Sequence, residues 1–505
     1  MDFVSKLERE RKDPPSFRAP NLFKMPAQEF EALFTPIIDY YSKIEDGQIY
    51  VKSFKKIIRD AFYFREELLT ETDNELADIL QQLYDRFDEH DTRTVASTVY
   101  PVDVVLMVYI LCALTGKHSL PAVVEYWRFY NPYLQLMIPN MPSPEHIPTH
   151  ETIRTVLKLV PPKEMELFFA DYFSKVITDI IPCDAVPESE DKSQSHRPKL
   201  AFDGQEVRAS WRRGETSRKK KGAISVSVYE CASKSVLGYT TTDCKGTEDK
   251  AFVSIIPKLS VMNNAIVCAD AINTKKVVFD EFNKYGIDYL FPVKDNRKVL
   301  REAMNSAFEN APDSDHLVYV ASPEKSSGRI TERKYTLIKA PLNLPNDQSL
   351  FNRTKCLLRY ETITQQYNKA KPKNTKTPST EIKDYITSLD FSQESFKELI
   401  HSIEVYWSIE SHHNTLDTVF MQDFMNMCDK EHLSNRIGIN KIVYNILTYQ
   451  RQLQGLKSKT PTYPFLADKC NKDPETAFAF LCAYWTAGAP QPVKTPKRIP
   501  TLITD

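Results

Sequence analysis

The stretch KLAFD (199–203) opens the part of the chain that decides the fold, because strand-forming segments replace helical ones from there on. The elements predicted after it are strands at AISVSVYE (223–230) and SVLGYTTTDC (235–244), a helix at 248–259, a strand at AIVCAD (265–270), a helix at 274–285 and a strand at DYLFPV (288–293). This alternation predicts an α/β domain built on a mixed sheet.

The order of three strands, helix, strand, helix and strand is typical of the ribonuclease-H-like fold, with a mixed five-stranded sheet and helices. Other α/β domains share parts of this order. In such a sheet the first strand, 199–203, and the fourth, 265–270, lie side by side. Their carboxyl ends should therefore meet at one edge.

Each of these two strands ends in an acid, Asp203 or Asp270. A single aspartate at a strand end is more often a turn or cap residue. Two carboxylates brought side by side repel each other, and divalent cations such as a pair of Mg²⁺ ions would compensate that repulsion. The pair therefore predicts a metal-binding crevice, because acids at the ends of buried strands are costly to place inside a core.

A third acid is expected from a helix that runs from Gln393 to about His413. Ile403, Tyr406, Trp407 and Glu410 recur there at helical spacing, which places Glu410 on the same face as an apolar stripe. A carboxylate on a packing face either pairs with a cation or binds metal. Taken alone, Glu410 is more often structural.

Basic residues follow the predicted strand 199–203, in the loop WRRGETSRKKKG (211–222). The loop is either a solvated hairpin tip or a phosphate-holding segment, and RKKK (218–221) also has the composition of a localisation signal. Lys294 and Arg297 come directly after the strand 288–293 and can reach the same crevice. The phosphate-binding candidates in this part of the chain are Arg212, Arg213, Lys219, Lys220, Lys294 and Arg297.

Composition restricts the class of protein. Hydrophobic residues make up 42% of the 505 residues and the formal net charge is −1, so the chain can bury a core and is not basic overall. The nine cysteines form no Cys-x-x-Cys pair, which favours reduced thiols inside a cell. The best apolar run, Val102–Leu114, contains Asp103 and is too short to span a bilayer. We expect an intracellular protein with no membrane contact.

The sequence predicts several parts. Helical patterning dominates before residue 183, and the four prolines of PNMPSPEHIPTHE (139–151) mark a loop with Thr149 as a helix cap. The expected divisions are an N-terminal helical extension (1–80), a helical domain (81–182), a linker (183–198), the α/β domain (199–455) with a β-containing insertion at about 295–384, and a C-terminal tail (456–505).

The chain resembles the H-repeat-associated transposases, a branch of the DDE insertion-sequence transposases, over about residues 83–447. The segments that match, all in the family's order, are DTR (91–93), YP (100–101), LTG (114–116), IPTHETIRTVL (147–157), LAFDGQEVRAS (200–210), VLGYTTTDCKGTEDKAFVSIIPKL (236–259), AIVCADAINTKK (265–276), YGIDYLFPVKDNRKVL (285–300), GRITERK (328–334), DYITSL (384–389) and YWSIESHHNTLDTVFMQD (406–423).

This resemblance implies an enzyme that binds the ends of a mobile element, cleaves DNA and joins the freed 3′-hydroxyl to target DNA. It implies that Asp203, Asp270 and Glu410 are catalytic and hold Mg²⁺ or Mn²⁺, two ions in all. It also implies DNA contacts by Arg208, Lys294, Arg329 and Arg333, self-association on DNA and no small-molecule substrate. The protein would work with the DNA, in the nucleus of a eukaryote or the cytoplasm and nucleoid of a bacterium.

The chain departs from the family pattern near the acids. Gln205 stands where the family has Lys, Glu404 and Tyr406 where it has Arg and His, and Ser411 where it has Asn. Gln422 and Asp423 replace a Glu-Asp pair. Fewer cations should weaken phosphate contacts near the metal site. Two alternatives therefore stay open: a domesticated DNA-binding protein with weak or no catalysis, and a metal-dependent endonuclease that does not join strands.

Overall fold

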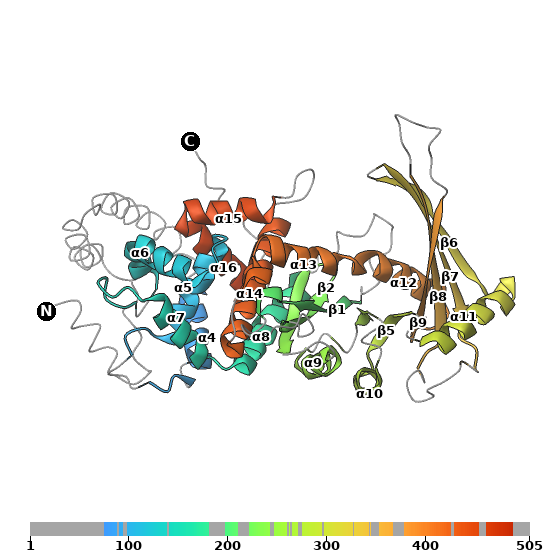
Figure 1. Ribbon diagram of the computed structural model, residues 1–505, viewed down its shortest axis with the longest axis horizontal. Coiled ribbons are helices and arrows are strands. Elements are labelled where there is room, and N and C mark those ends of the chain that lie inside the picture. The colour runs from blue at the N-terminus through green and yellow to red at the C-terminus, as the bar shows by residue number, and fades with distance from the viewer. Residues whose placement is uncertain are drawn as a thin grey trace. The chain divides into compact units, whose positions relative to one another are not determined.

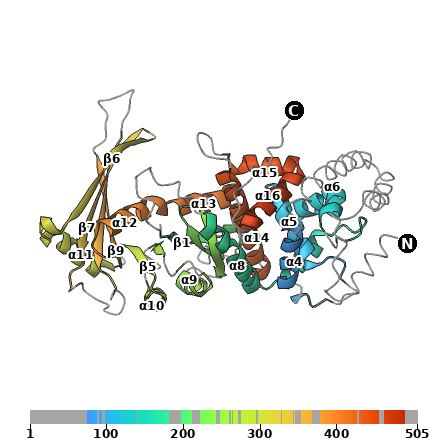
Figure 2. The ribbon, with the colours of Figure 1, turned by 180° about the vertical axis from the view of Figure 1, so that it is seen from behind.

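The computed structural model describes much of the chain in two compact units, Met1–Ile180 with Ile442–Asp505, and Ile181–Lys441 (Figures 1 and 2). The described residues are 75–87, 90–93, 98–138, 141–180, 197–210, 222–242, 247–259, 262, 265–270, 275–294, 297–326, 328–342, 344, 353–366, 378–425, 429–453 and 461–487. Most of the predicted N-terminal extension and linker lies outside them.

The described residues of the first unit form helices and no strand, as the prediction of an all-α domain requires. These helices are α4 (Glu75–Phe87), α5 (Val102–Leu114), α6 (Leu120–Met137), α7 (His150–Leu159), α8 (Pro162–Ile180), the second half of α14 (Lys430–Leu453), α15 (Tyr463–Lys472) and α16 (Pro474–Ala487). Every residue of α5 is buried, because α4, α6, α7, α15 and α16 pack around it. The predicted cap at Thr149 is present: its side chain accepts a hydrogen bond from the Thr152 N–H.

The segment predicted as a C-terminal tail is instead partly an integral piece of this unit. Residues 461–487 form α15 and α16, which bury Leu466, Cys470, Phe478 and Leu481. Thr462 caps α15 by accepting a hydrogen bond from the Phe465 N–H, with a proline in the first helical positions. The prolines and lysines of this segment therefore mark helix ends. No helix in the described part of the chain is both long and apolar enough to cross a membrane.

A single nine-stranded sheet forms the centre of the second unit. Its strands are β1 (Lys199–Glu206), β2 (Ile224–Glu230), β3 (Ser235–Thr242), β4 (Ile266–Ala269), β5 (Asp288–Val293), β6 (Leu317–Ser326), β7 (Arg329–Lys339), β8 (Cys356–Gln366) and β9 (Ser379–Thr387). They lie in the order β3-β2-β1-β4-β5-β9-β8-β7-β6, with β1, β4 and β5 parallel and all other pairs antiparallel.

The mixed sheet was predicted correctly, but its count of five strands was wrong. The segment predicted as an insertion continues the same sheet, because β9 pairs with the free edge of β5, Leu290 opposite Thr387 and Val293 opposite Asp384. The helix α11 (Lys298–Asn310) and strand β6 also went unpredicted. The helix buries Leu300, Met304 and Phe308 at four-residue spacing.

Helices cover both faces of the sheet. The helices α9 (Glu248–Ile255) and α10 (Lys276–Tyr285) lie on one face, and α12 (Gln393–Tyr406) and α13 (Ser408–Thr418) lie on the other (Figures 1 and 2). Aromatic rings fill the first layer: Phe202 of β1 stacks on Phe252 of α9 at 3.6 Å between centroids, and Phe279 of α10 meets Tyr289 and Phe291 of β5. These rings contribute strongly to the stability of the fold because each buries a large apolar surface.

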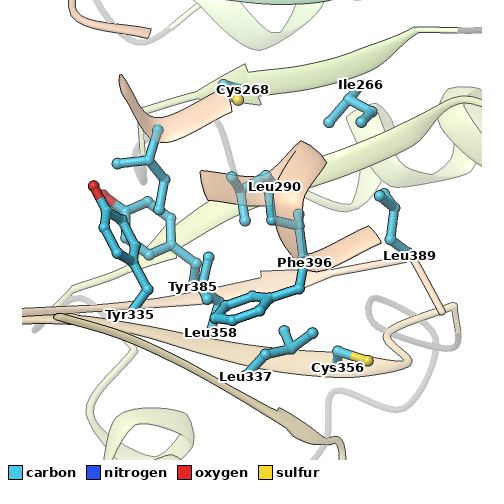
Figure 3. Close-up of a cluster of buried hydrophobic side chains, with 12 residues drawn as sticks. Ile266, Cys268, Leu290, Tyr335, Leu337, Cys356, Leu358, Tyr385, Leu389 and Phe396 are labelled. Carbon is cyan, nitrogen blue, oxygen red and sulfur yellow. The ribbon is translucent and has the colours of Figure 1, made fainter. Parts of the chain in front are cut away.

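The opposite face carries a second apolar cluster, shown in Figure 3. Leu290, the residue between Tyr289 and Phe291, points to this side because side chains alternate along a strand. It joins a cluster that also contains Ile266, Cys268, Tyr335, Leu337, Cys356, Leu358, Tyr385, Leu389, Phe396, Leu399 and Ile403. Helix α12 therefore packs on both the predicted core strands and the strands added beside them.

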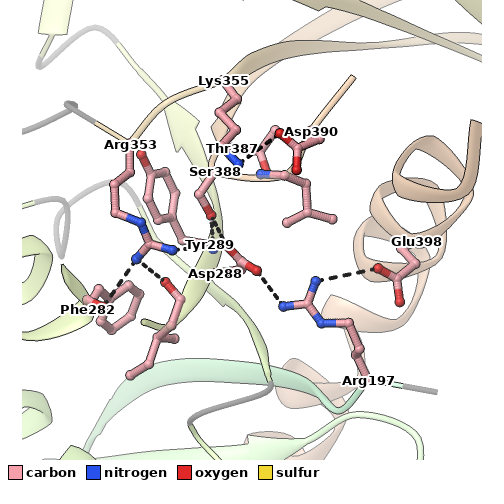
Figure 4. A network of polar contacts seen from close by, with 12 residues as sticks. Arg197, Phe282, Asp288, Tyr289, Arg353, Lys355, Thr387, Ser388, Asp390 and Glu398 are labelled. Carbon is pink, nitrogen blue, oxygen red and sulfur yellow. Dashed lines mark hydrogen bonds and ion pairs between the residues drawn. The ribbon is translucent and has the colours of Figure 1, made fainter. Parts of the chain in front are cut away.

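A polar network fixes the end of the sheet at which β1 and β5 begin (Figure 4). Asp288 accepts hydrogen bonds from Arg197 (2.5 Å), Arg353 (3.2 Å) and Ser388 (2.6 Å). Arg353 also donates to the carbonyl oxygens of Phe282 and Ile287, which ties α10 and β5 together. Lys199 and Glu398 extend the network by an ion pair of 3.0 Å. This end lies opposite to the one where Asp203 and Asp270 stand.

Candidate active site

Asp203 is the first residue of β1 whose side chain reaches solvent. The four residues before it are buried, whereas 31% of its own side chain is exposed. The Gly204 N–H donates a hydrogen bond of 2.8 Å to Oδ1, which holds the carboxylate at this edge. Because β1 and β4 are parallel and Phe202 lies opposite Ala269, the strands lead Asp203 and Asp270 to the same edge of the sheet.

The pKa of Asp203 is raised to about 6. Burial is the largest cause, and the negative charges of Asp270, Glu410 and Glu248 add to it, whereas the hydrogen bond from Gly204 acts in the opposite direction. Both other predicted acids are therefore electrostatic neighbours of Asp203. The site concentrates negative charge.

Asp270 follows β4 and is paired with a lysine. Lys294, directly after β5, places Nζ 2.6 Å from Asp270 Oδ1, with 60% of the lysine side chain and 42% of the aspartate side chain exposed. The structure thus places Lys294 beside Asp270. The Asp270 carboxylate therefore has a positively charged partner in this structure.

Glu410 lies near the start of α13 and is exposed, so the predicted apolar face was wrong for this residue. The predicted single helix breaks at Trp407, which belongs to neither α12 nor α13. Ser408 Oγ donates to the Val405 carbonyl oxygen (2.6 Å) and the Glu410 N–H to that of Trp407 (3.2 Å). The break ends the stripe, leaving Trp407 40% exposed and Glu410 free of any ion pair with a described residue.

The donor chemistry of these acids fits a hard divalent cation, because carboxylate oxygens are the ligands that Mg²⁺ and Mn²⁺ prefer. Among the described residues no three His, Cys, Asp or Glu side chains lie close enough together to hold one metal ion as they stand. Glu410 is exposed and can rotate toward Asp203. The carboxylates are therefore of the right chemical type for such an ion, but their side chains must move before three of them can bind it together.

Glu248 is an acid of this site that sequence reasoning did not select. It begins α9 and is 8% exposed. Its Cγ lies 3.1 Å from the place where a Cβ on Gly204 would stand, so Gly204 leaves the room in which Glu248 approaches β1. Asp249, the next residue, turns elsewhere and pairs with Lys275 at 3.1 Å. The signal available in the sequence was the Lys-x-x-Glu start of this helix.

A buried polar layer lies behind Asp203. His413 places Nδ1 3.6 Å from Asp203 Oδ2, but burial, together with the charge of Lys441, lowers the pKa of His413 to about 3. The imidazole is therefore neutral near pH 7 and makes no ion pair. Lys441 of α14 is fully buried and donates to Ser227 Oγ at 2.7 Å, and Ser227 lies directly opposite Asp203 in the β1–β2 ladder.

Two of the departures from the resembled pattern contact each other. Gln422 Nε2 donates to Gln205 Oε1 at 3.0 Å, and Gln205 Nε2 donates to Asp417 Oδ1 at 2.7 Å and to the His413 carbonyl oxygen at 3.1 Å. An uncharged Gln–Gln contact thus stands where the resembled family has Lys and Glu. The two changes compensate each other, because neither leaves an unpaired charge in the buried layer.

The other basic candidates are scattered. Arg208 pairs with Asp423 (3.4 Å), and Arg297 precedes α11. Arg329 and Arg333 lie on β7, separated from β5 by β9 and β8, and Arg333 pairs with Glu324 (2.7 Å). The structure therefore does not bring these two to the acids. Four further candidates lie outside the described residues: Arg212, Arg213, Lys219 and Lys220.

Two family models match the chain. Residues 194–446 match the model of the transposase DDE domain, and residues 85–173 match the model of the DDE_Tnp_1-associated domain. The protein YbfL of Escherichia coli K12 is 24% identical over 361 residues, which cover 70% of this chain and 87% of YbfL. The "H repeat-associated putative transposase YhhI" of the same organism is 26% identical, covering 62% of this chain and 77% of YhhI.

Among solved structures, a piggyBac transposase synaptic complex with hairpin DNA overlaps 86% of this chain and 85% of its own, at 10% identity and a TM-score of 0.33. A TM-score this low does not establish a common fold. The family models establish the family, because the match to the transposase DDE domain covers half of the chain and includes all three predicted acids. The chain belongs to the DDE transposase family.

Proposed function

We propose that this protein is a DDE transposase that cleaves the ends of a mobile element and transfers the 3′-hydroxyl into target DNA. The observation that carries the proposal is that the parallel strands β1 and β4 lead Asp203 and Asp270 to one edge of the sheet, in a chain of this family. The negative charge of Glu410 also acts on Asp203. The strand order β3-β2-β1-β4-β5 supports a ribonuclease-H-like core to which β9, β8, β7 and β6 are added.

Asp203, Asp270 and Glu410 would hold two Mg²⁺ or Mn²⁺ ions. When bound, such a pair lowers the pKa of the attacking water or hydroxyl and stabilises the leaving oxygen of an in-line displacement. Asp203 and Asp270 are positioned by the rigid strands, and Glu410 by the first turn of α13. Lys294 would leave Asp270 on loading and turn to a DNA phosphate, because an exposed ion pair is weak enough to exchange partners.

The remaining parts would serve DNA handling. We propose that the DNA-binding residues include Arg208, Lys294 and Arg297. We also propose that residues 81–182 belong to a domain associated with a catalytic domain that begins at residue 199 and ends with the second compact unit, at Lys441. Two ends must meet for transposition, so the protein would self-associate on DNA. It would act inside the cell, where its DNA substrate lies.

One observation favours a second candidate, a DNA-binding protein descended from a transposase. The positions at which the resembled family has Arg and His are Glu404, which is exposed, and Tyr406, whose pKa is raised by burial first and then by Asp203. The acids therefore lack two cations that would neutralise a phosphate near them. An endonuclease that cuts without joining is the third candidate.

The test is cleavage of a labelled duplex carrying the DNA that flanks this gene, with Mg²⁺ or Mn²⁺, by the wild type and by Asp270→Ala. We expect metal-dependent cutting that the variant loses, followed by joined products when target DNA is added. Cutting without joined products would support the endonuclease. DNA binding without cutting under either metal would support the domesticated protein.

Glu248 should tune the metal site without being essential to it. We expect Glu248→Gln to raise the Mn²⁺ concentration needed for half-maximal cleavage by about 10-fold, in the range seen when residues that support metal ligands are changed. The matched control is Asp249→Asn, since Asp249 is the adjacent buried acid and faces Lys275. An equal shift in both variants would assign the effect to the fold of α9.

A further inference from the structure

One edge of the sheet is formed by β6, which pairs only with β7 among the described strands (Figure 1). The first half of β6, residues 317–321, reads LVYVA and contains no charged side chain. Val318, Tyr319 and Val320 are 52%, 47% and 63% exposed. Edge strands are usually protected by charges, prolines or a covering element, because their unpaired backbone groups accept a strand from another chain. Three exposed apolar side chains in a row on such an edge therefore indicate an interface.

The apolar stretch ends at a defined point. The register between β6 and β7 shifts between Ala321 and Glu324, and Pro323, which lies in this shift, has no backbone N–H to donate. Beyond it Glu324 is already paired with Arg333, at 2.7 Å. A further strand can therefore pair with residues 317–321 and is hindered past them.

A ladder of tyrosine rings leads to the same edge. Tyr360 of β8, Tyr335 of β7 and Tyr319 of β6 lie directly opposite one another in the sheet. The rings of Tyr335 and Tyr360 stack at 4.9 Å between centroids, and the ring of Tyr319 follows at 6.1 Å from that of Tyr335. Tyr319 is half exposed and is the last ring of this ladder among the described strands. An aromatic ring on the next strand would continue the ladder.

A second copy of the same strand meets these requirements. Antiparallel pairing about a two-fold axis at Tyr319 places each Tyr319 opposite its own counterpart, Val318 opposite Val320, and Leu317 opposite Ala321. All of these positions are apolar, so the side chains match on both faces of the joined sheets. The tyrosine ladder then runs on into the second copy without interruption.

The charges at the two ends of β6 agree with this arrangement. Asp313 and Asp315 lie in the turn before the strand, and Lys325 lies near its other end. Antiparallel pairing therefore brings the acidic turn of one copy toward the lysine of the other. Lys325 also has a partner within its own chain, so the charges assist the pairing and the apolar positions carry it.

We propose that two copies of this chain pair through β6, antiparallel about a two-fold axis at Tyr319, so that their two sheets join into one. This proposal rests on the self-association included in the proposed function and gives it a surface, but it requires neither DNA nor a metal ion. The strands β9, β8 and β7 lie between β5 and β6, so the interface is separate from the acids.

Sedimentation equilibrium of the full chain, without DNA and in reducing buffer, measures the association at concentrations up to about 50 µM. We expect a monomer–dimer equilibrium for the wild type. Val320→Lys should raise the dimer dissociation constant by at least about 10-fold, because the two-fold axis places a charge against Val318 at two symmetric points. Val277→Lys is the matched control, since Val277 is a 44% exposed valine on α10, and it should leave the constant unchanged.

Crosslinking tests the register. Val318→Cys and Val320→Cys are prepared separately and oxidised alone and as an equimolar mixture, with the wild type as the baseline. We expect a disulfide-linked dimer above this baseline in the mixture only. Directly opposite residues have Cα atoms about 4.5–5.5 Å apart, within reach of a disulfide, whereas each cysteine and its own copy lie on a diagonal of about 7–8 Å.

The outcomes separate this proposal from the proposed function. A wild type that stays monomeric at every concentration overturns the pairing and leaves the edge to a strand of another protein or of this chain. A dimer that Val320→Lys and Val277→Lys weaken equally also overturns it, as does crosslinking of each cysteine variant alone as readily as in the mixture. A dimer that passes both tests but neither binds nor cuts DNA supports the interface and overturns the proposed function alone.

Discussion

Replacing Asp203 with Asn should abolish catalysis and stabilise the metal-free protein at the same time. We expect metal-dependent cleavage to fall by at least about 10³-fold, because a neutral amide cannot replace the carboxylate that holds the cation. The free energy of unfolding should rise by about 1–2 kcal/mol at pH 8, because the pKa of about 6 means that the Asp203 carboxylate is disfavoured in the folded state. The Asn side chain can still accept the Gly204 hydrogen bond.

The pH dependence has a definite sign. A carboxyl whose pKa rises on folding contributes stability below its unfolded value, near pH 4, and loses it as the pH rises to 6. Wild type and Asp203→Asn should therefore have similar stability at pH 4, and the variant should be the more stable above pH 6. Thermal unfolding in EDTA between pH 4 and 8 measures this difference.

Asp288→Asn is the matched control, because Asp288 lies at the other end of the same sheet and is held by Arg197, Arg353 and Ser388. It should lower stability by about 2 kcal/mol and leave cleavage within a few-fold of wild type, since hydrogen bonds to a charged group are lost far from the acids. An Asp203→Asn protein that still cuts at the wild-type rate would remove Asp203 from the site. One that is destabilised would show that the carboxylate is held rather than repelled.

The paired aspartates could be predicted from the sequence because their signal is local. Asp203 and Asp270 each follow a short apolar run, and the order of the elements makes β1 and β4 neighbours. Glu410 was selected partly for a wrong physical reason, the apolar stripe. No glycine or proline marks the helix break at Trp407, which is set by how α12 and α13 pack on the sheet.

The four added strands depend on contacts between distant residues. Pairing of β9 with β5 joins Tyr385 to Pro292 across nearly a hundred residues, and such pairings follow from side-chain packing that local propensity does not encode. The strand β6 lacks the usual alternation, because most of its side chains are exposed on both faces. Gln205 and Gln422 also depend on a contact between distant residues. In the sequence each is an isolated departure from the family pattern, and only the contact between them explains both.

Replacing Lys441 should have the second large effect, a change in how stability depends on pH. Only the folded chain buries this lysine. Burial lowers its pKa to about 7, although Asp417 opposes this. The unfolded chain keeps the proton up to about pH 10, so wild-type stability should rise between pH 7 and 10. In Lys441→Met that rise should be smaller by about 3 kcal/mol, because no ammonium is desolvated on folding.

Urea unfolding of both proteins at intervals between pH 7 and 10 measures this difference, and subtraction removes the titration of every other group. Lys441→Arg supplies the opposite control: its charge persists at all these pH values, so it should be less stable than wild type throughout. A wild-type-minus-Met difference that does not change with pH would show that Lys441 keeps an ordinary pKa. Ser227 would then be bonded to a permanent charge directly opposite Asp203, and the acids would have a buried counter-ion that replaces the cations lost at Glu404 and Tyr406.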